Sequence, residues 1–194
     1  MVTAVPTTTL RDVLAMNGDV LRIAVVADSH SAPHPRCLEH LAAAKPDRIL
    51  HAGDIGNLQV LDRLATVAPV LAVRGNIDGH REDIPDVRVL DVAHEGETLA
   101  TLLLLHIAVN GPKLRADAWR LAEKVDASVV VCGHSHVPFV GRDRGRVMFN
   151  PGSIGPRRFQ LPILFGILDI DRTRGVRMHH VDCETGLEWR PRRA

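Results

Sequence analysis

Short apolar runs that stop abruptly at polar residues recur along the first half of the chain. Residues 21–27 form an apolar, β-branched run of the kind found in strands buried on both faces, and residues 48–52 form another. Between the two runs, residues 37–44 are rich in Leu and Ala, which favour helix, and Pro46 ends that segment. This order predicts a β-α-β unit.

The alternation continues through a second helix and a third strand. Asn57 can cap a helix whose apolar residues recur at helical spacing up to Ala65, and Pro69 closes it. Residues 70–73 then form a third apolar run. Open α/β sheets bind ligands at the carboxyl ends of their strands, so the polar residues that follow these runs are candidates for a site.

Beyond Ile84 the pattern changes to short apolar runs with little helical sequence among them. Apolar residues between 114 and 125 share one helical face, which predicts a single helix there. The strands expected in this half are residues 87–92, 98–105, 128–132, 137–140, 147–150, 163–169 and 176–181. We therefore predict an α/β fold of two sheets packed face to face, with helices covering the outside.

The first twenty residues stand apart from this pattern. They are polar and rich in Thr at the start, without the basic start and long apolar stretch of a signal peptide. We expect residues 1–20 to form a frayed extension or a short helix. No Gly/Ser linker divides the rest, and at roughly 150 residues per domain the length predicts one domain over residues 21–194.

Charge and composition narrow the classes of function. Lys and Arg number 24 against 23 Asp and Glu, a net charge of +1, which leaves no long-range field for nucleic acid or an anionic membrane. Three cysteines without a CxxC pair predict neither a disulfide framework nor a thiolate zinc site, and no apolar run is long enough to span a membrane. We expect a cytoplasmic protein. Phe, Trp and Tyr together make up only 3% of the chain, whereas 11 residues are His.

The chemistry of the chain gathers at the ends of the predicted strands. Seven carboxylate, amide or imidazole side chains follow an apolar run directly or lie in the loop after it: Asp28, His30, Asp54, Asn76, His106, His134 and His136. Seven ligands exceed the four of a tetrahedral zinc ion but suit two divalent ions of higher coordination, and such ions lie about 3.5–4 Å apart. Without thiolates, the set favours Mn, Fe, Zn, Ni or Mg over copper.

The motifs that carry these residues follow one another in a fixed order: Asp28-x-His30, Gly53-Asp54, Gly75-Asn76-x-Asp78, His106 and Gly133-His134-x-His136. In this order they resemble the motifs of the calcineurin-like metallophosphoesterase superfamily. The segments His51–Asp54 and Asn150–Ser153 are most similar to its small single-domain bacterial and archaeal phosphodiesterases. The resemblance covers nearly the whole chain after Val20 and implies a four-layer α/β/β/α sandwich, in agreement with the two sheets expected above.

The resemblance also implies two sets of metal ligands joined by Asp54, which would bridge the ions: Asp28, His30 and His136 for the first ion, and Asn76, His106 and His134 for the second. Asp54, Asn76 and His106 are expected to take part in catalysis. Two divalent ions outweigh two carboxylates and a bridging hydroxide by one positive charge, which can meet an anionic phosphate. Metal coordination can lower the pKa of water to roughly 7, so a bridging hydroxide could attack phosphorus in line at neutral pH.

Two positions depart from the family pattern. Many relatives carry a His directly after the Asn, where it acts as general acid for the leaving group, but this chain has Ile77. Protonation of the leaving group lacks an obvious donor, which favours phosphodiesters or aryl esters with good leaving groups. After His106, where Gly is usual, the chain has Ile107 and Ala108, which changes the expected shape of that loop.

Several residues near the motifs have both a functional and a structural interpretation. Arg74 and Asp78 flank Asn76 and could orient it, or could form an ion pair. Arg157, like Arg158, could reach a substrate phosphate or remain solvated on its loop.

The other histidines are not expected to bind metal. His51 lies inside its strand, so we expect a buried side chain that supports the site. Asn150–Ser153 has the composition of a tight turn beneath the site. The remaining histidines are expected on the surface: His34, His40, His80, His94, His179 and His180.

Three classes of function follow. The first is a binuclear metal-dependent phosphoesterase that acts on a small phosphoester, a phosphodiester in first place and with Mn as the first choice of ion. The second is a non-catalytic scaffold: the retromer subunit resembles this family in fold but holds protein partners and has lost a catalytic ligand, whereas all seven positions here are filled. The third, a nuclease or protein phosphatase, is disfavoured by the net charge and the length. Of these classes we expect the enzyme, as either a monomer or an oligomer.

Overall fold

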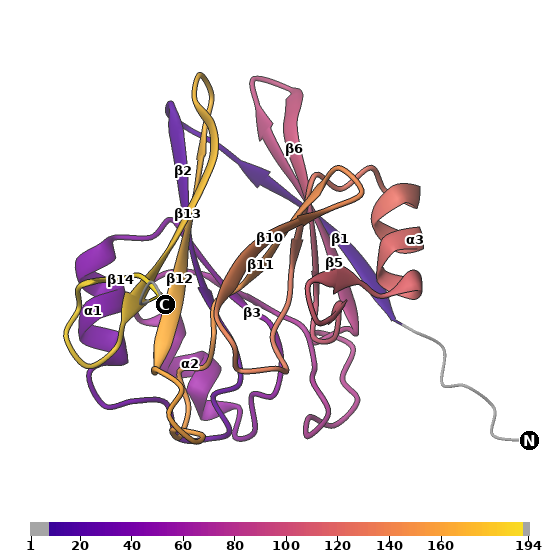
Figure 1. Ribbon diagram of the computed structural model, residues 1–194. Helices are drawn as coiled ribbons and strands as arrows, with labels where there is room; N and C mark the ends of the chain where they lie inside the picture. Colours follow the sequence, from indigo (N-terminus) through magenta and orange to yellow (C-terminus); the bar gives the residue numbers. More distant parts are fainter. Residues whose placement is uncertain (1–7, 192–194) are drawn as a thin grey trace, which may run out of the picture.

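Two six-stranded sheets face each other in the computed structural model, which describes residues 8–191 (Figure 1). The first sheet contains, in spatial order, β1 (Thr9–Ala15), β5 (Val87–His94), β6 (Glu97–Leu105), β9 (Val129–Val131), β11 (Arg146–Asn150) and β10 (Phe139–Asp143). The second contains β14 (Glu188–Trp189), β13 (Gly175–Asp182), β12 (Leu164–Asp171), β2 (Val20–Val26), β3 (Arg48–His51) and β4 (Val70–Ala72). Both sheets contain parallel and antiparallel pairs of strands.

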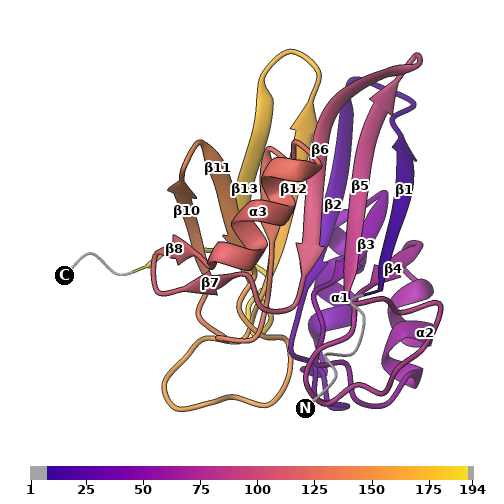
Figure 2. The same cartoon turned by 90° about the vertical axis from the view of Figure 1, so that its right-hand side faces the viewer.

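Helices cover the outer faces of the two sheets. The second sheet packs against α1 (Cys37–Ala44) and α2 (Gln59–Ala65), and the first against α3 (Ala116–Lys124), which lies in front of it in Figure 2. A short hairpin of β7 (Val109–Asn110) and β8 (Lys113–Leu114) precedes α3. Three buried apolar clusters fill the three interfaces between these layers. The predicted four-layer α/β/β/α sandwich is therefore confirmed.

The central strands are buried on both faces, which explains why they are apolar throughout. In β2, Ile23 and Val25 point to the opposite sheet, whereas Ala24 and Val26 point to α1 and α2. Side chains alternate because successive residues of a strand face opposite sides of the sheet. Full burial of such a side chain contributes about 1.5–3 kcal/mol. The run predicted as a buried strand is thus the boundary between two cores.

The N-terminal segment differs from its sequence expectation. Residues 9–15 were expected to be frayed or helical, and that prediction is wrong, because they form β1, parallel to β5 at the edge of the first sheet. Leu14 is the one buried side chain of β1, so no alternating pattern reveals the strand. Polar contacts hold it instead, including a 2.7 Å ion pair between Arg88 and Asp12. Residues 1–7 of the expected extension lie outside the described part of the chain.

Smaller differences arise at strand ends. The strand expected at residues 137–140 begins only at Phe139, because Pro138 cannot donate a ladder hydrogen bond. The N-cap of α2 is Leu58 rather than the predicted Asn57, although the Asn57 side-chain oxygen accepts a 3.0 Å hydrogen bond from the amide of Gln59, the first residue of the helix. Among the described residues, no helix is long and apolar enough to cross a membrane.

The strands place their polar ends together. β2, β3 and β4 are parallel, and so are β6 and β9, so their carboxyl ends lie at the same end of their sheets. Long loops occupy this end, drawn at the bottom of Figures 1 and 2, while the β5–β6 and β12–β13 hairpins occupy the opposite end. The candidate site residues therefore meet at the loop end of the sandwich.

Candidate metal centre

Carboxylates and imidazoles from four loops converge at the loop end. Asp28, His30 and His136 each offer a ligand atom within 4.8 Å of the others, and Asp54 and His106 form a second group of the same kind with Asp28. The rings of His30 and His136 stack, with their Nε2 atoms 3.3 Å apart. Because Asp28 belongs to both groups, the two are neighbours.

His134 and Asn76 lie on the solvent side of these groups. The His134 ring packs edge-on against His106 with 5.1 Å between centroids, and its backbone N–H donates to the Asp28 carboxylate at 3.0 Å. Asn76 lines a hollow of about 300 Å³ together with His106. Both side chains are exposed, whereas Asp28 and His106 are buried. The site therefore has a buried half and an open half.

The backbone at the site is strained. Five of the seven candidate residues have a left-handed backbone, with φ between 44° and 67°: Asp28, His30, Asp54, His134 and His136. Such a conformation costs a non-glycine residue about 1–3 kcal/mol and persists only where surrounding structure enforces it. The neighbouring loop enforces it here, since the amides of Asp28 and His30 donate to the carbonyls of Gly53 and Asp54. The strain turns the side chains at successive strand ends toward one another.

Two motif glycines allow the loops to approach closely. A Cβ at Gly75 would overlap the backbone and carboxylate of Asp54. A Cβ at Gly133 would lie 2.9 Å from the Asp28 carboxylate, closer than a side chain tolerates. Glycine precedes the candidate ligands at these positions because a side chain would push the carboxylates out of place.

The buried carboxylates form no ion pair with Lys or Arg among the described residues. Burial, together with repulsion from Asp54, raises the pKa of Asp28 to about 8. Among the described residues, the ion-pair partners of Asp28 and Asp54 are histidines at 3.3–3.7 Å. Burial lowers the pKa of His136 to about 4 and also lowers the pKa of His106, so these rings are neutral near pH 7. Neutral rings offer lone pairs but do not offset the carboxylates.

The hydrogen bonds of His106 leave one nitrogen aimed at the carboxylates. Its Nδ1 donates to the Ala52 carbonyl at 2.7 Å, which leaves Nε2 as the acceptor, 3.3 Å from Asp54 Oδ1. This buried Nε2, like Nδ1 of His136, has no hydrogen-bond partner in the described part of the chain. A bound cation would satisfy a buried lone pair that lies beside a carboxylate. Histidines that bind metal often donate from their other nitrogen to a backbone carbonyl, as His106 does here. The oxygen and imidazole donor set fits a divalent metal ion.

His51 is buried beneath the site, as predicted. The Gly53 amide donates to its Nδ1 at 3.2 Å, so its Nε2 carries the proton and donates to Ser29 Oγ at 2.9 Å. Ser29 in turn donates to the Ile55 carbonyl at 3.0 Å, and burial lowers the pKa of His51 to about 4. This chain ties the loop of Asp28 to the loop of Asp54. Ser29 was not among the predicted site residues, and its signal in the sequence is a small hydroxyl residue between the two motif ligands Asp28 and His30.

The Asn150–Ser153 segment supports the loops from below, as predicted. Asn150 Nδ2 donates to the Gly133 carbonyl at 2.7 Å, and Ser153 Oγ donates to the Asp28 carbonyl at 2.9 Å. The prediction that His180 lies on the surface is wrong. It is buried, and its Nε2 donates to the Asn150 carbonyl at 2.8 Å, because its strand position faces inward.

Asp78 and Arg74 do not form the ion pair that the sequence left open. The Asp78 carboxylate accepts backbone N–H groups of Ile55, Gly56 and Gly75 at 2.7–3.1 Å, which joins the loop after β3 to the loop after β4. Arg74 pairs with Asp86. Asp78 therefore positions the loop that carries Asn76 through its backbone.

The two loop arginines have different surroundings. Arg157 is occupied by Glu184 and by the Leu161 carbonyl. Arg158 instead lies at the candidate metal centre, with its Nη2 3.1 Å from His30 Nε2. Of the two arginines considered from the sequence, Arg158 is therefore the one at the site, and Arg157 is not.

The chain resembles several curated proteins. It is 29% identical over 144 residues to a probable metallophosphoesterase of Methanocaldococcus jannaschii, which covers 70% of this chain and 69% of that protein. It is 26% identical over 153 residues to the probable metallophosphoesterase YsnB of Bacillus subtilis, covering 78% of this chain and 85% of that protein.

Solved structures share the fold. Vacuolar Protein Sorting 29 from Cryptosporidium parvum superimposes with a TM-score of 0.70 at 18% identity, covering 88% of this chain and 95% of that chain. YfcE, a phosphoesterase from E. coli, gives a TM-score of 0.57 at 19% identity, covering 86% and 96%. At these identities the likeness shows the fold alone. Residues 21–173, which include all the motifs, match the family model of the calcineurin-like phosphoesterase superfamily domain. The family predicted from the motifs is confirmed, and the chain belongs to the calcineurin-like phosphoesterase superfamily.

Proposed function

We propose that this protein is a binuclear metal-dependent phosphoesterase that hydrolyses phosphodiesters. One observation carries the proposal: within residues 8–191, His106 presents a buried Nε2 without a hydrogen-bond partner to the Asp54 carboxylate, in a cluster whose carboxylates form no ion pair with Lys or Arg. The names of the curated relatives, probable metallophosphoesterases, agree with this chemistry.

The ligands would divide between two ions. Asp28, His30 and His136 would hold the first, and Asp54 would be shared. His106 would hold the second ion with the two exposed candidates, Asn76 and His134. The surroundings of Asp54 support this division, because Oδ2 lies 3.7 Å from His30 Nε2 of the first set and Oδ1 lies 3.3 Å from His106 Nε2 of the second.

The chain's own residues would then bind and orient the phosphate. Divalent ions would supply Lewis acidity that activates water near neutral pH and offsets phosphate charge. Arg158 can donate from its guanidinium to a phosphoryl oxygen beside His30. Asn76 is expected to contribute an amide oxygen, which adds no negative charge. Ala52 holds the His106 ring in the tautomer that leaves Nε2 free.

A preference for good leaving groups follows from Ile77. Its backbone N–H donates to Asp54 Oδ1 at 3.2 Å, so this residue adjoins the centre, yet its side chain is apolar and 53% exposed. It offers no proton to a leaving group. Hydrolysis should therefore depend on leaving groups that need little protonation, as in aryl diesters.

The experiment is a substrate panel with metal analysis on the same sample. Protein loaded with Mn²⁺ is expected to hydrolyse bis-p-nitrophenyl phosphate faster than p-nitrophenyl phosphate, with about two ions bound per chain. Absence of bound metal after incubation with Mn²⁺ or Zn²⁺, together with absence of hydrolysis, would refute the proposal. That result would favour the scaffold, for which the likeness to Vacuolar Protein Sorting 29 supplies a fold but no activity.

A further inference from the structure

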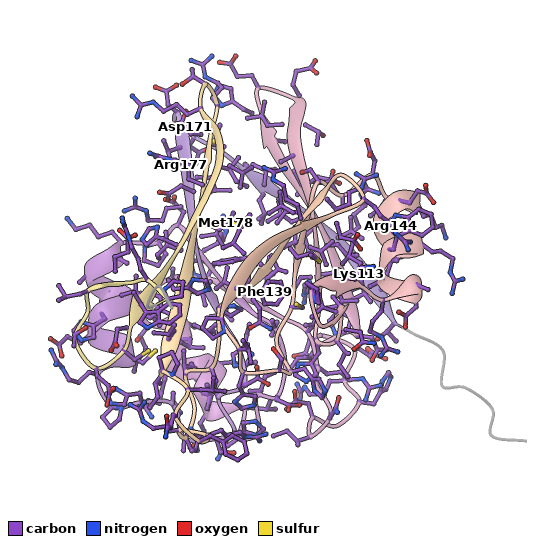
Figure 3. The ribbon with its side chains drawn as sticks, viewed as in Figure 1. Lys113, Phe139, Arg144, Asp171, Arg177 and Met178 are labelled. Atoms are coloured by element: carbon purple, nitrogen blue, oxygen red, sulfur yellow. The ribbon has the colours of Figure 1, made fainter. Side chains whose placement is uncertain are left out.

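A groove of about 770 Å³ opens beside the candidate metal centre. The β7–β8 hairpin, the loop after β9 and strand β10 form its walls. Figure 3 labels Phe139 of β10 and Lys113 of β8 in this region. The groove has the size of small-molecule sites, which are usually about 300–1,000 Å³. Its apolar lining residues are Ile107, Val109, Pro112, Val137, Phe139 and Val140.

The groove is continuous with the open half of the metal centre. His134, whose ring packs against His106, lines the groove, and Ser135 lines it next to His134. Ile107 lines both the groove and the hollow that contains Asn76. A molecule whose phosphate lies at the centre could thus extend one substituent into the groove without crossing a wall of the protein.

The groove combines exposed apolar surface with positive charge. Val137 and Val140 are 45% and 51% exposed, so their apolar side chains face solvent. Arg142 also lines the groove and forms no ion pair with the residues that the structure describes. In the described part of the chain, Arg115 pairs only with the exposed Asp117, at 3.4 Å. This surface suits a ligand that is anionic overall and apolar in part.

Ser135 adds a hydrogen-bond donor at the junction of groove and centre. Its Oγ accepts the Val137 amide and the Asn150 side-chain amide, both at 3.2 Å. A hydroxyl that already accepts two hydrogen bonds keeps its own proton available for a further acceptor. An ester or phosphoryl oxygen at the mouth of the groove could accept it.

We propose that this groove binds one ester arm of the substrate, and that the substrate class is phosphodiesters with a bulky apolar or aromatic arm. The proposal rests on the proposed function, because the metal centre would hold the phosphate. A small arm such as methyl would leave the apolar walls in water. A large arm would cover them, and each buried Å² of apolar surface favours binding.

The test compares two monoesters that share the phosphate and differ in the arm. The affinities of 2-naphthyl phosphate and methyl phosphate for Mn²⁺-loaded protein are measured by calorimetry and by competitive inhibition of bis-p-nitrophenyl phosphate hydrolysis. We expect 2-naphthyl phosphate to bind at least about tenfold more tightly. Val140→Glu and the uncharged Val140→Gln should both abolish this preference. Val13→Glu, on β1 and 69% exposed, is the matched control and should retain it.

The outcomes separate the two proposals. Equal affinity for the two monoesters in a protein that binds metal and hydrolyses diesters overturns the groove assignment alone. A preference that survives in both Val140 variants also overturns it, because the arm would then lie elsewhere. Failure of the proposed function has a different signature, namely wild-type protein without bound metal and without hydrolysis, and it removes both proposals. Circular dichroism of each variant checks that the exposed substitution leaves the fold intact.

Discussion

Buried carboxylates at the two ends of the sandwich have opposite surroundings. At the hairpin end, Asp169 accepts two hydrogen bonds from Arg22, at 2.8 and 3.1 Å. Asp171, labelled near the top of Figure 3, accepts backbone N–H groups of the β12–β13 turn, and these hydrogen bonds lower its pKa. At the loop end, Asp28 and Asp54 have only histidines as ion-pair partners among the described residues.

The difference separates carboxylates that serve the fold from those that serve a site. A buried carboxylate with its own guanidinium or amide donors is satisfied within the chain. Asp28 accepts one backbone amide, that of His134, but this hydrogen bond does not offset burial and repulsion from Asp54, which raise its pKa to about 8. The carboxylates at the loop end would therefore be stabilised by a bound cation. The same end carries the left-handed backbone of five candidate ligands, so strain and unpaired charge occur together.

Removal of a loop-end carboxylate is expected to have the largest effect. Asp54→Ala should reduce hydrolysis of bis-p-nitrophenyl phosphate by more than the roughly 10–100-fold loss typical of residues that only support a metal ligand. Steady-state kinetics at saturating Mn²⁺ measure it. The control is Asp169→Asn at the hairpin end, which should keep the activity and lower the free energy of unfolding by about 1 kcal/mol. Equal activity losses in the two variants would erase the distinction between the ends.

Metal binding should stabilise the fold through the loop end only. At a concentration of 100 times its Kd, a metal adds about 2.7 kcal/mol of stability, or about 5–10 °C in the unfolding temperature of a chain of this size. Differential scanning calorimetry with Mn²⁺ and with a chelator measures the shift. Asp54→Ala should abolish it and Asp169→Asn should preserve it. A full shift in Asp54→Ala would contradict the ligand assignment.

The metal-free protein should lose stability as pH rises from about 6.5 to about 8. In this window unfolded Asp28 is ionised, since its ordinary pKa is 3.8, while folded Asp28 keeps its proton up to about 8. The unfolded state binds fewer protons, so a higher pH favours unfolding. Below pH 6.5 the lowered pKa of His136, about 4 in the folded state, has the opposite effect, so the window above 6.5 isolates Asp28.

Two measurements check this pH dependence. Urea unfolding of protein treated with a chelator gives the free energy of unfolding at each pH. Its decrease between pH 6.5 and 8 should be smaller in Asp28→Asn. Carbon-13 NMR of the Asp28 carboxyl gives its titration directly. A titration near pH 4 in the folded metal-free protein would contradict the contrast between the two ends, because Asp28 would then behave like a satisfied carboxylate.

The smallest expected effect distinguishes two adjacent arginines at the loop end. Arg158→Ala should raise the KM for the diester by roughly tenfold, since a hydrogen bond to a charged group is worth about 1.5 kcal/mol or more. Arg157→Ala should leave KM near the wild-type value, because Arg157 is engaged by Glu184 and the Leu161 carbonyl. Steady-state kinetics on both variants decide the matter, and equal effects would show that the loop acts as a whole.

Much of this fold could be predicted because burial leaves a pattern. β2 and β3 are apolar on both faces and end at polar residues, so their existence, order and carboxyl ends are legible in the sequence. β1 left no such pattern, because a single one of its side chains, Leu14, is buried. Ion pairs between β1 and β5 stabilise the strand instead. His180 was misplaced because the sequence does not show which of two adjacent histidines faces inward.

The sequence by itself determined the chemistry available at the strand ends: which residues can donate oxygen or imidazole ligands, and in what order along the chain. Tertiary structure decided how those residues meet. Left-handed backbone and close contacts of Gly75 and Gly133 place Asp28 and Asp54 next to each other and to the site histidines. Loop packing places Arg158 rather than Arg157 beside His30. These features depend on contacts between segments distant in sequence, and such contacts leave no local pattern. The groove beside His134 arises in the same way, from β10 and the β7–β8 hairpin packed against each other.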